Sequence, residues 1–106
     1  MTDILAVYTT VGSLDEARTM ARTLVERKLV ACAQISAIES LYRWEGAVQQ
    51  SPEWRLLFKT TADLYPQLES AILACHPYEL PAVCAVAYDR CHEPFSDWVR
   101  SECTGP

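Results

Sequence analysis

The sequence predicts an α+β fold for one domain that spans residues 1–106. Some short segments have the β-branched and alternating apolar residues that are typical of strands. They alternate along the chain with two segments whose apolar residues recur at helical spacing. A chain of 106 residues with 50% hydrophobic content suffices for one core and leaves too few residues for a second. We therefore expect one four-stranded antiparallel sheet with two helices, a long hairpin and a short C-terminal helix.

The first predicted strand covers residues 4–9 and gives way to a helix after Gly12. Ser13 and Glu16 have the spacing of a capping box, in which a hydroxyl and a carboxylate satisfy free backbone N–H groups at a helix start. Apolar side chains then recur at helical spacing on the face that we expect to be buried. These are Leu14, Ala17, Ala21, Leu24 and Val25.

A β-hairpin is predicted in the middle of the chain. Its first strand runs from Leu29 to near Trp44, and Glu45-Gly46 forms the reversal. The return strand covers residues 54–60. Because strand side chains alternate, one face of that strand carries Trp54, Leu56 and Phe58, and the other carries Arg55, Leu57 and Lys59.

A second helix is predicted after the hairpin. Thr60 or Thr61 caps it, Pro66 is tolerated in its first turn, and Pro77 ends it. Its apolar residues fall at helical spacing at Leu64, Leu68, Ala71, Ile72 and Cys75.

A strand and a short helix complete the chain. Residues 82–88 form an almost continuous apolar run, which we expect to be buried on both faces. Residues 93–99 predict an amphipathic helix, since Pro94 suits a first helical turn and Phe95, Trp98 and Val99 share a face.

This order of elements is the split βαβ arrangement of ferredoxin-like domains. Right-handed crossovers place both long helices on one face of the sheet. The other face then exposes apolar residues such as Leu57 and Cys84, over an area larger than monomers usually tolerate. We expect copies of the chain to cover that face, although spacing alone does not set their number.

Charge and cysteine content limit the classes of partner. The net charge is −5, and only nine Lys and Arg residues are spread along the chain, which argues against nucleic acid and anionic membranes as partners. The first residues lack the pattern of a signal peptide and no apolar run is long enough for a membrane span, so we expect a cytoplasmic protein. The five cysteines show no CxxC spacing, which favours reduced thiols over a disulfide framework.

Three segments resemble the CutA family of divalent-cation tolerance proteins. They are LYRWEG at residues 41–46, LFKTT at 57–61 and HPYELP at 76–81. The family pattern also includes, in the same order along the chain, Tyr8-Thr9-Thr10, residues 29–33 and Trp98. The resemblance spans nearly the whole chain. It implies a ferredoxin-like fold assembled as a homotrimer with strands paired across subunits, and an association with copper or other divalent cations, with no obligatory cofactor.

His76 is the leading candidate metal ligand, and Cys75 beside it could add a thiolate. The competing structural role for His76 is to cap the carbonyls at the end of the second helix. Some metal-binding family members have a cysteine at the position of Tyr8, a histidine at that of Cys75 and a glutamate at that of Ala82. The resemblance therefore carries over only His76 as a ligand.

Other cysteines and histidines are weaker candidates. Cys91-His92-Glu93 contains three metal-capable residues, but adjacent positions make a poor tetrahedral site, so we expect a solvated loop. Cys32 and Cys84 lie in apolar segments and are expected to be small core residues.

Several further residues occupy positions of the family pattern and could line a cleft between subunits. Aromatic rings together with one lysine would suit a small anionic ligand, whereas core and interface packing is the alternative. These residues are Tyr42, Trp44, Lys59, Thr60, Tyr65, Tyr78 and Trp98.

The leading functional hypothesis is a trimeric protein of metal-ion tolerance that binds a divalent cation such as copper weakly. The alternative is a trimeric signalling or scaffold module that binds a small anionic metabolite or a partner protein in the inter-subunit cleft. We expect no enzymatic activity, since the chain has no GxSxG motif, phosphate-binding glycine-rich loop or CxxC pair.

Overall fold

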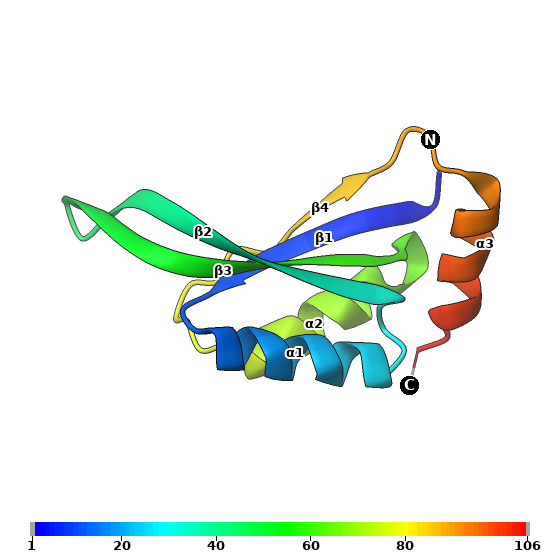
Figure 1. Ribbon diagram of the computed structural model, residues 1–106, viewed down its shortest axis with the longest axis horizontal. Coiled ribbons are helices and arrows are strands. Elements are labelled where there is room, and N and C mark those ends of the chain that lie inside the picture. Colours follow the sequence, from blue (N-terminus) through cyan, green and yellow to red (C-terminus); the bar gives the residue numbers. More distant parts are fainter. Residues whose placement is uncertain (1, 106) are drawn as a thin grey trace.

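A computed structural model describes residues 2–105 and confirms the predicted fold. One antiparallel sheet has the strand order β2-β3-β1-β4, and the helices α1 and α2 lie together on one of its faces (Figure 1). This strand order is that of ferredoxin-like domains. Within the described residues, no helix is both long and apolar enough to cross a membrane.

The first strand and helix follow the sequence prediction closely. Strand β1 covers Ile4–Val11 and helix α1 covers Leu14–Glu26. The Ser13 hydroxyl accepts the Glu16 backbone N–H at 3.1 Å and donates to the Glu16 carboxylate at 2.9 Å, as a helix cap requires. Met20 is buried with Ala17 and Leu24 on the core face.

The prediction that Val25 lies on the buried face of α1 is wrong, because Val25 is 40% exposed. Met20 lies three residues after Ala17 and four before Leu24, so it completes the buried stripe at helical spacing. Val25, one residue after Leu24, is turned about 100° away from that stripe.

The hairpin is longer than the sequence predicts. Strands β2 (Cys32–Trp44) and β3 (Ala47–Thr61) pair from Cys32↔Lys59 to Trp44↔Ala47. Glu45 and Gly46 form the turn with φ values of 52° and 79°, the left-handed geometry that tight hairpins need.

The predicted start of the return strand at Trp54 is wrong, since β3 begins at Ala47. Pro52 makes that outer segment a poor strand candidate in sequence, because proline donates no ladder hydrogen bond. The structure tolerates it because pairing with β1 ends at Val11↔Trp54, so at Pro52 the strand has only β2 as a neighbour.

The core lies between the sheet and the two long helices. Leu56 and Phe58 of β3 are fully buried with Val7 of β1, against Leu68 and Ile72 of α2. This confirms the predicted inner face of β3. A 3-10 turn over Ala62–Leu64 leads into α2, which covers Tyr65–Cys75 and contains Pro66 at its start.

Neither predicted threonine caps this helix with its side chain. Thr61 occupies the cap of the 3-10 turn but makes no side-chain cap bond. The Thr60 hydroxyl instead donates to the Leu29 carbonyl at 2.7 Å, deep in the core. Because Thr60 is fully buried, its hydroxyl takes the acceptor that lies nearest in the tertiary structure.

The prediction that the last strand is buried on both faces is wrong. Strand β4 covers only Cys84–Ala87, and Val86 is 60% exposed. Cys84 is likewise exposed, which corrects its expected place in the core. The reason is the strand order: β4 lies at the edge of the sheet and pairs only with β1. Cys32, at the start of β2, is half-buried.

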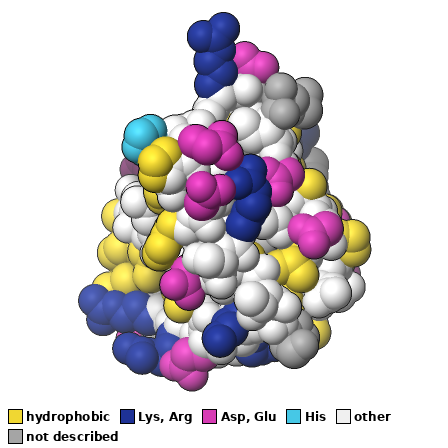
Figure 2. Space-filling view, turned by 90° about the vertical axis from the view of Figure 1, so that its right-hand side faces the viewer, with side chains coloured by type: hydrophobic (Ala, Val, Ile, Leu, Met, Phe, Trp, Pro, Cys, Tyr) yellow, Lys and Arg dark blue, Asp and Glu magenta, His cyan; other side chains and the backbone are white. Residues whose placement is uncertain are grey.

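The C-terminal helix α3 (Glu93–Glu102) closes one end of the sheet. Val99 and Cys103 pack with Ile4 and Leu64 in a second, smaller core cluster. Arg100 donates to the Asp3 carboxylate at 2.7 Å and so ties the helix to the N-terminal segment. Figure 2 shows this end of the molecule, where Asp and Glu side chains are interspersed with Lys and Arg.

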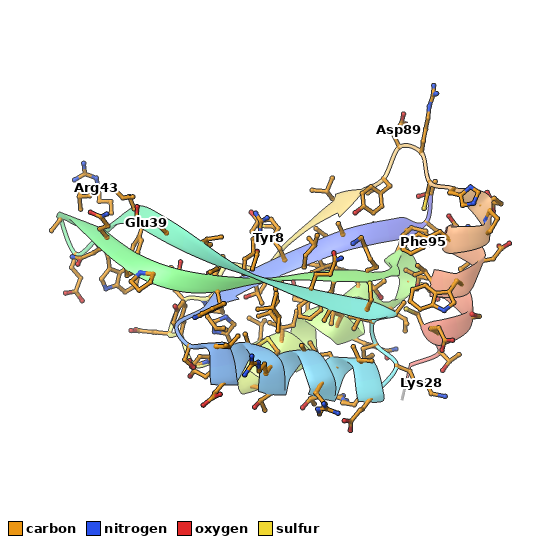
Figure 3. The ribbon with its side chains drawn as sticks, in the orientation of Figure 1. Tyr8, Lys28, Glu39, Arg43, Asp89 and Phe95 are labelled. Atoms are coloured by element: carbon orange, nitrogen blue, oxygen red, sulfur yellow. The ribbon has the colours of Figure 1, made fainter. Side chains whose placement is uncertain are left out.

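No helix or strand within residues 2–105 covers the middle of the sheet face opposite α1 and α2. Alternation along the paired strands places Tyr8, Leu57 and Val86 on this face, and Figure 3 shows Tyr8 pointing away from the helices. Lys59 lies on the same face as Leu57, as the strand alternation predicts, and donates to Gln34 at 3.2 Å. We call this surface the open face.

Candidate functional site

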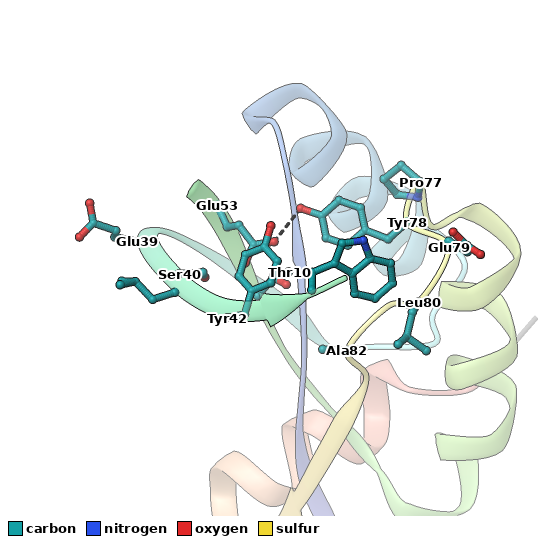
Figure 4. Close-up of a pocket in the computed structure, with 12 residues that line it drawn as sticks. Thr10, Glu39, Ser40, Tyr42, Glu53, Pro77, Tyr78, Glu79, Leu80 and Ala82 are labelled. Atoms are coloured by element: carbon teal, nitrogen blue, oxygen red, sulfur yellow. Dashed lines mark hydrogen bonds between the residues drawn. The ribbon is translucent and has the colours of Figure 1, made fainter. Parts of the chain in front are cut away.

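A groove of about 840 Å³ lies between the outer part of the β2–β3 hairpin and the connector that follows α2 (Figure 4). The hairpin contributes side chains from residues 39–42, Trp44 and Glu53, β1 contributes Thr10, and the connector contributes residues 77–80 and Ala82. Three elements far apart in the sequence therefore meet at this site.

The groove depends on how the connector leaves α2. Helix α2 ends at Cys75, and His76 adopts an extended conformation with φ −74° and ψ 134°. Proline disfavours a helical conformation in the residue before it, so Pro77 stops the helix at this point. The connector then runs past Thr10, near the end of β1, and past Glu53 of β3.

His76 fixes the connector to β1 through both ring nitrogens. Nδ1 accepts the Tyr78 backbone N–H at 3.0 Å, so the ring proton belongs on Nε2. Nε2 lies 3.0 Å from the Thr10 carbonyl, to which it donates, and 3.0 Å from the Thr9 hydroxyl. Burial lowers the pKa of His76, which favours this neutral imidazole.

Tyr78 fixes the connector to β3. Its hydroxyl donates to the Glu53 carboxylate at 2.6 Å, and its ring centroid lies 5.0 Å from that of His76. Burial and this hydrogen bond to a carboxylate raise the pKa of Tyr78 well above its ordinary value of 10.0. Glu53 is only 9% exposed, so a carboxylate lies nearly buried in the wall of the groove.

The two predicted metal ligands lie side by side in sequence but have separate environments. The Cys75 thiol donates to the Ala71 carbonyl at 3.3 Å, and burial raises the pKa of that thiol. Both ring nitrogens of His76 are engaged as described above. Residues 2–105 contain no group of three or more His, Cys, Asp or Glu side chains placed to hold a metal ion. The ligand role of Cys75 and His76 therefore stays a prediction.

The alternative structural role predicted for His76 needs a correction. The ring bonds to β1 and to the connector, whereas a capping role would turn it onto the carbonyls of α2. In the second cluster, the Glu93 carboxylate accepts Arg100 at 3.5 Å and Cys91 packs against the small core cluster. His92 and Glu93 are exposed, in line with the predicted solvated segment.

The groove brings together three of the seven residues predicted to line a cleft, namely Tyr42, Trp44 and Tyr78. The other four lie elsewhere in the single chain. Lys59 is on the open face, and Thr60 is buried in the core. Tyr65 donates to Glu69 of the same helix at 3.0 Å, and Trp98 lies on α3 with its ring centroid 5.7 Å from that of Phe95.

Sequence reasoning missed Glu53, the residue that Tyr78 binds. The segment before Trp54 gives no strand pattern, so the sequence places Glu53 in a loop beyond the sheet. Its partner lies 25 residues away, with α2 between them. A lone glutamate beside a proline carries no signal that could have identified it.

Comparison with known proteins decides the family. The profile described as "CutA1 divalent ion tolerance protein" matches residues 5–102. The chain belongs to the CutA family. It is 41% identical over 95 residues to the divalent-cation tolerance protein CutA of Thermus thermophilus, with 89% of this chain and 92% of that protein covered.

Solved CutA structures share the fold. CutA from Synechococcus elongatus superposes with a TM-score of 0.94 at 34% identity, covering 98% of this chain and 93% of that one. The protein from Archaeoglobus fulgidus, described as a periplasmic divalent cation tolerance protein CutA, gives 0.92 at 32% identity, covering 94% and 98%. Membership of a family of divalent-cation tolerance proteins thus agrees with the family resemblance found in the sequence.

The Tyr78–Glu53 bond should appear in the alkaline stability of the protein. Because the pKa of Tyr78 is raised in the folded chain, this tyrosine stabilises the fold fully below about pH 10 and loses that contribution as the pH rises, when only the unfolded chain ionises. At neutral pH, Tyr78→Phe should lower the free energy of unfolding by about 1 kcal/mol. Urea unfolding of both proteins from about pH 8 to about pH 11 measures the difference, which should shrink above pH 10. A difference that stays constant with pH would contradict this account.

Proposed function

We propose that this CutA protein acts in divalent-cation tolerance as a homotrimer that binds copper weakly and catalyses no reaction. The observation that carries the functional part is the family match over residues 5–102, which includes nearly every element of the fold.

The open face supports the homotrimer. Two helices cover one side of the sheet. Leu57 and Tyr8 lie on the other side, where the described part of the chain places no further element over them (Figure 3). Strands β2 and β4 are the two edges of the sheet, and β4 is exposed. Closed assemblies cover such faces and pair such edges between subunits, which prevents open-ended aggregation.

The chemistry of Cys75 and His76 supports weak binding of copper. Imidazole nitrogen and thiolate sulfur are donors that copper accepts. Binding would require His76 to give up a hydrogen bond to Thr10 or Tyr78, and the Cys75 thiol to lose its proton despite a raised pKa. Both requirements lower the affinity, and two donors leave a coordination sphere that another subunit or water must complete.

The absence of catalysis is supported by the protonation and the hydrogen bonding of the side chains that could react. The raised pKa values of Tyr78 and Cys75 keep the hydroxyl and the thiol protonated near neutral pH, where each is a poor nucleophile. His76 has no free ring nitrogen for general acid–base work in this arrangement.

The alternative function, binding of a small anionic metabolite or a partner protein between subunits, has less support for its anionic form. The groove is lined by Glu39, Glu53 and Glu79, whereas Lys59 lies away from it on the open face. Carboxylates repel an anionic ligand.

For the compartment we propose the cytoplasm, although the A. fulgidus relative is described as periplasmic. The support is that Cys75 and Cys84 are free and exposed, which suits a reducing compartment. Immunoblots of fractionated cells would test this, and recovery in an envelope fraction alone would contradict it.

The trimer is tested by light scattering of the purified protein at low micromolar concentration. The expected mass is that of three 11.9-kDa chains. Leu57→Glu, which places a charge in the middle of the open face, should yield monomers, because an unpaired charge is costly in an interface. Leu73→Glu is the matched control on the exposed side of α2 and should keep the trimer. A wild-type monomer, or a trimeric Leu57→Glu variant, would contradict the assembly.

The copper site is tested by thermal unfolding with increasing Cu(II) or Zn(II). A ligand that prefers the folded state raises its stability by mass action, by about 1.4 kcal/mol at ten times the dissociation constant. Cu(II) should raise the melting temperature reversibly with chelator, and the rise should fall in His76→Gln and Cys75→Ser. His92→Gln, an exposed histidine on the loop before α3, is the control and should respond as wild type. An undiminished response in the Cys75/His76 double variant would exclude these ligands.

A further inference from the structure

One positive charge on the open face has no partner within its own chain. Arg55 lies opposite Thr10 of β1 and Ser36 of β2, which are both uncharged. Because strand side chains alternate, it stands on the same face as Leu57, two residues away. Arg55 is exposed, and none of the ion pairs formed within residues 2–105 includes it. The open face therefore carries a cation beside its apolar residues.

The proposed homotrimer places this guanidinium in an interface. Arginine keeps its charge in proteins, so it cannot avoid the cost of losing water by giving up a proton. A charge that is buried between subunits without a partner is strongly destabilising. The copy that covers the open face must therefore bring an acceptor to Arg55. In a closed ring of three, each copy presents one patch to one neighbour and a different patch to the other, so the acceptor lies elsewhere on the same chain.

The groove between the hairpin and the connector has the opposite charge. Its charged lining residues are Glu39, Glu53 and Glu79, and its lining within residues 2–105 contains no Lys or Arg. Glu53 is the most constrained of these acids, since it is only 9% exposed and one carboxylate oxygen accepts the Tyr78 hydroxyl at 2.6 Å. No hydrogen-bond donor in the described part of the chain reaches its second oxygen. Like charges that line one groove repel, and a cation from outside relieves that repulsion.

The acidic cluster near α3, in contrast, is already neutralised. Arg100 donates to Asp3 at 2.7 Å, and also to Asp97 at 2.9 Å and Glu93 at 3.5 Å. A second cation would find these carboxylates partly compensated. The groove is therefore the better acceptor for a charge that arrives from a neighbouring copy.

Arg55 is the cation best placed to enter such a groove. The basic residues of α1 lie on the helix-covered side of the sheet. Arg90 and Arg100 already have carboxylate partners, and Lys59, which shares the open face, donates to a glutamine of β2 at 3.2 Å. Arg43 lies at the outer end of the hairpin (Figure 3), where alternation turns it onto the opposite face of β2.

We infer that, in the homotrimer, Arg55 of each copy enters the acid-lined groove of the next copy and binds its Glu53 carboxylate. A guanidinium suits this acceptor, because it forms short charge-assisted bonds with carboxylates and stacks on aromatic rings. Tyr42 and Trp44 supply such rings in the groove, and they are 45% and 41% exposed in the single chain. The groove is thus one half of a subunit contact. This inference rests on the proposed homotrimer and adds the charge pair that helps to hold it.

Zero-length cross-linking tests the contact directly. A carbodiimide joins an amine to a carboxylate only where the two touch, so Arg55→Lys places a reactive amine at the proposed contact. We expect covalent dimers and trimers on denaturing gels, with mass spectrometry linking the lysine at position 55 of one chain to Glu53, Glu39 or Glu79 of another. Arg27→Lys, at the exposed end of α1 on the other side of the sheet, is the matched control and should give no more inter-chain product than wild type. Inter-chain links from position 55 that miss these three acids, or no links above the wild-type level, would overturn the inference.

Charge reversal tests what the contact contributes to assembly. Arg55→Glu sets another carboxylate against the groove, and in a fixed, sub-denaturing concentration of urea it should raise the protein concentration of half-dissociation at least about tenfold. Arg27→Glu makes the same change of charge away from the open face and should stay within about twofold of wild type. An undiminished Arg55→Glu trimer would overturn the inference. Should that variant fail to fold, the cross-linking result decides.

Light scattering of the wild-type protein separates this inference from the proposed function. A wild-type monomer contradicts the homotrimer and removes the contact with it. A wild-type trimer whose Arg55→Lys variant gives no cross-links to the groove keeps the homotrimer and contradicts only the charge pair.

Discussion

The antiparallel pairing of β1 with β3 is the constraint on which the rest of this structure depends. It runs from Ile4↔Thr61 to Val11↔Trp54 and sets Val7 beside Phe58 in the core. A shift of one residue would exchange the inner and outer faces of the strand and turn Leu57 into the core in place of Phe58. With two helices on the inner face, this register also determines which side chains form the open face.

The same pairing explains why the hairpin leaves the body of the domain. Strand β1 ends at Val11, opposite Trp54, whereas β2 and β3 continue to Trp44 and Ala47 (Figure 1). An isolated two-stranded ribbon is marginally stable in water. The connector after α2 lies beside this ribbon and forms the groove with it, and most residues of the ribbon are exposed in the single chain. A closed oligomer would bury both the ribbon and the open face.

His76 and Tyr78 hold that connector in place. One imidazole joins the connector to β1 and one phenol joins it to Glu53 of β3, so two neighbouring residues link three parts of the fold. The cost is that His76 has no free nitrogen for a ligand. A family signature residue is thus structural in the single chain.

The sequence by itself determined the local features and the family. The Ser13–Glu16 cap, the Glu45-Gly46 turn and the inner face carrying Leu56 and Phe58 all follow from neighbouring residues, whose spacing acts within one helix or one hairpin. Only the tertiary structure decided that β4 is an exposed edge, that His76 reaches β1 across 67 residues, and that Glu53 is buried beside Tyr78. These outcomes depend on strand order and on contacts between distant segments, which no local pattern of residues encodes.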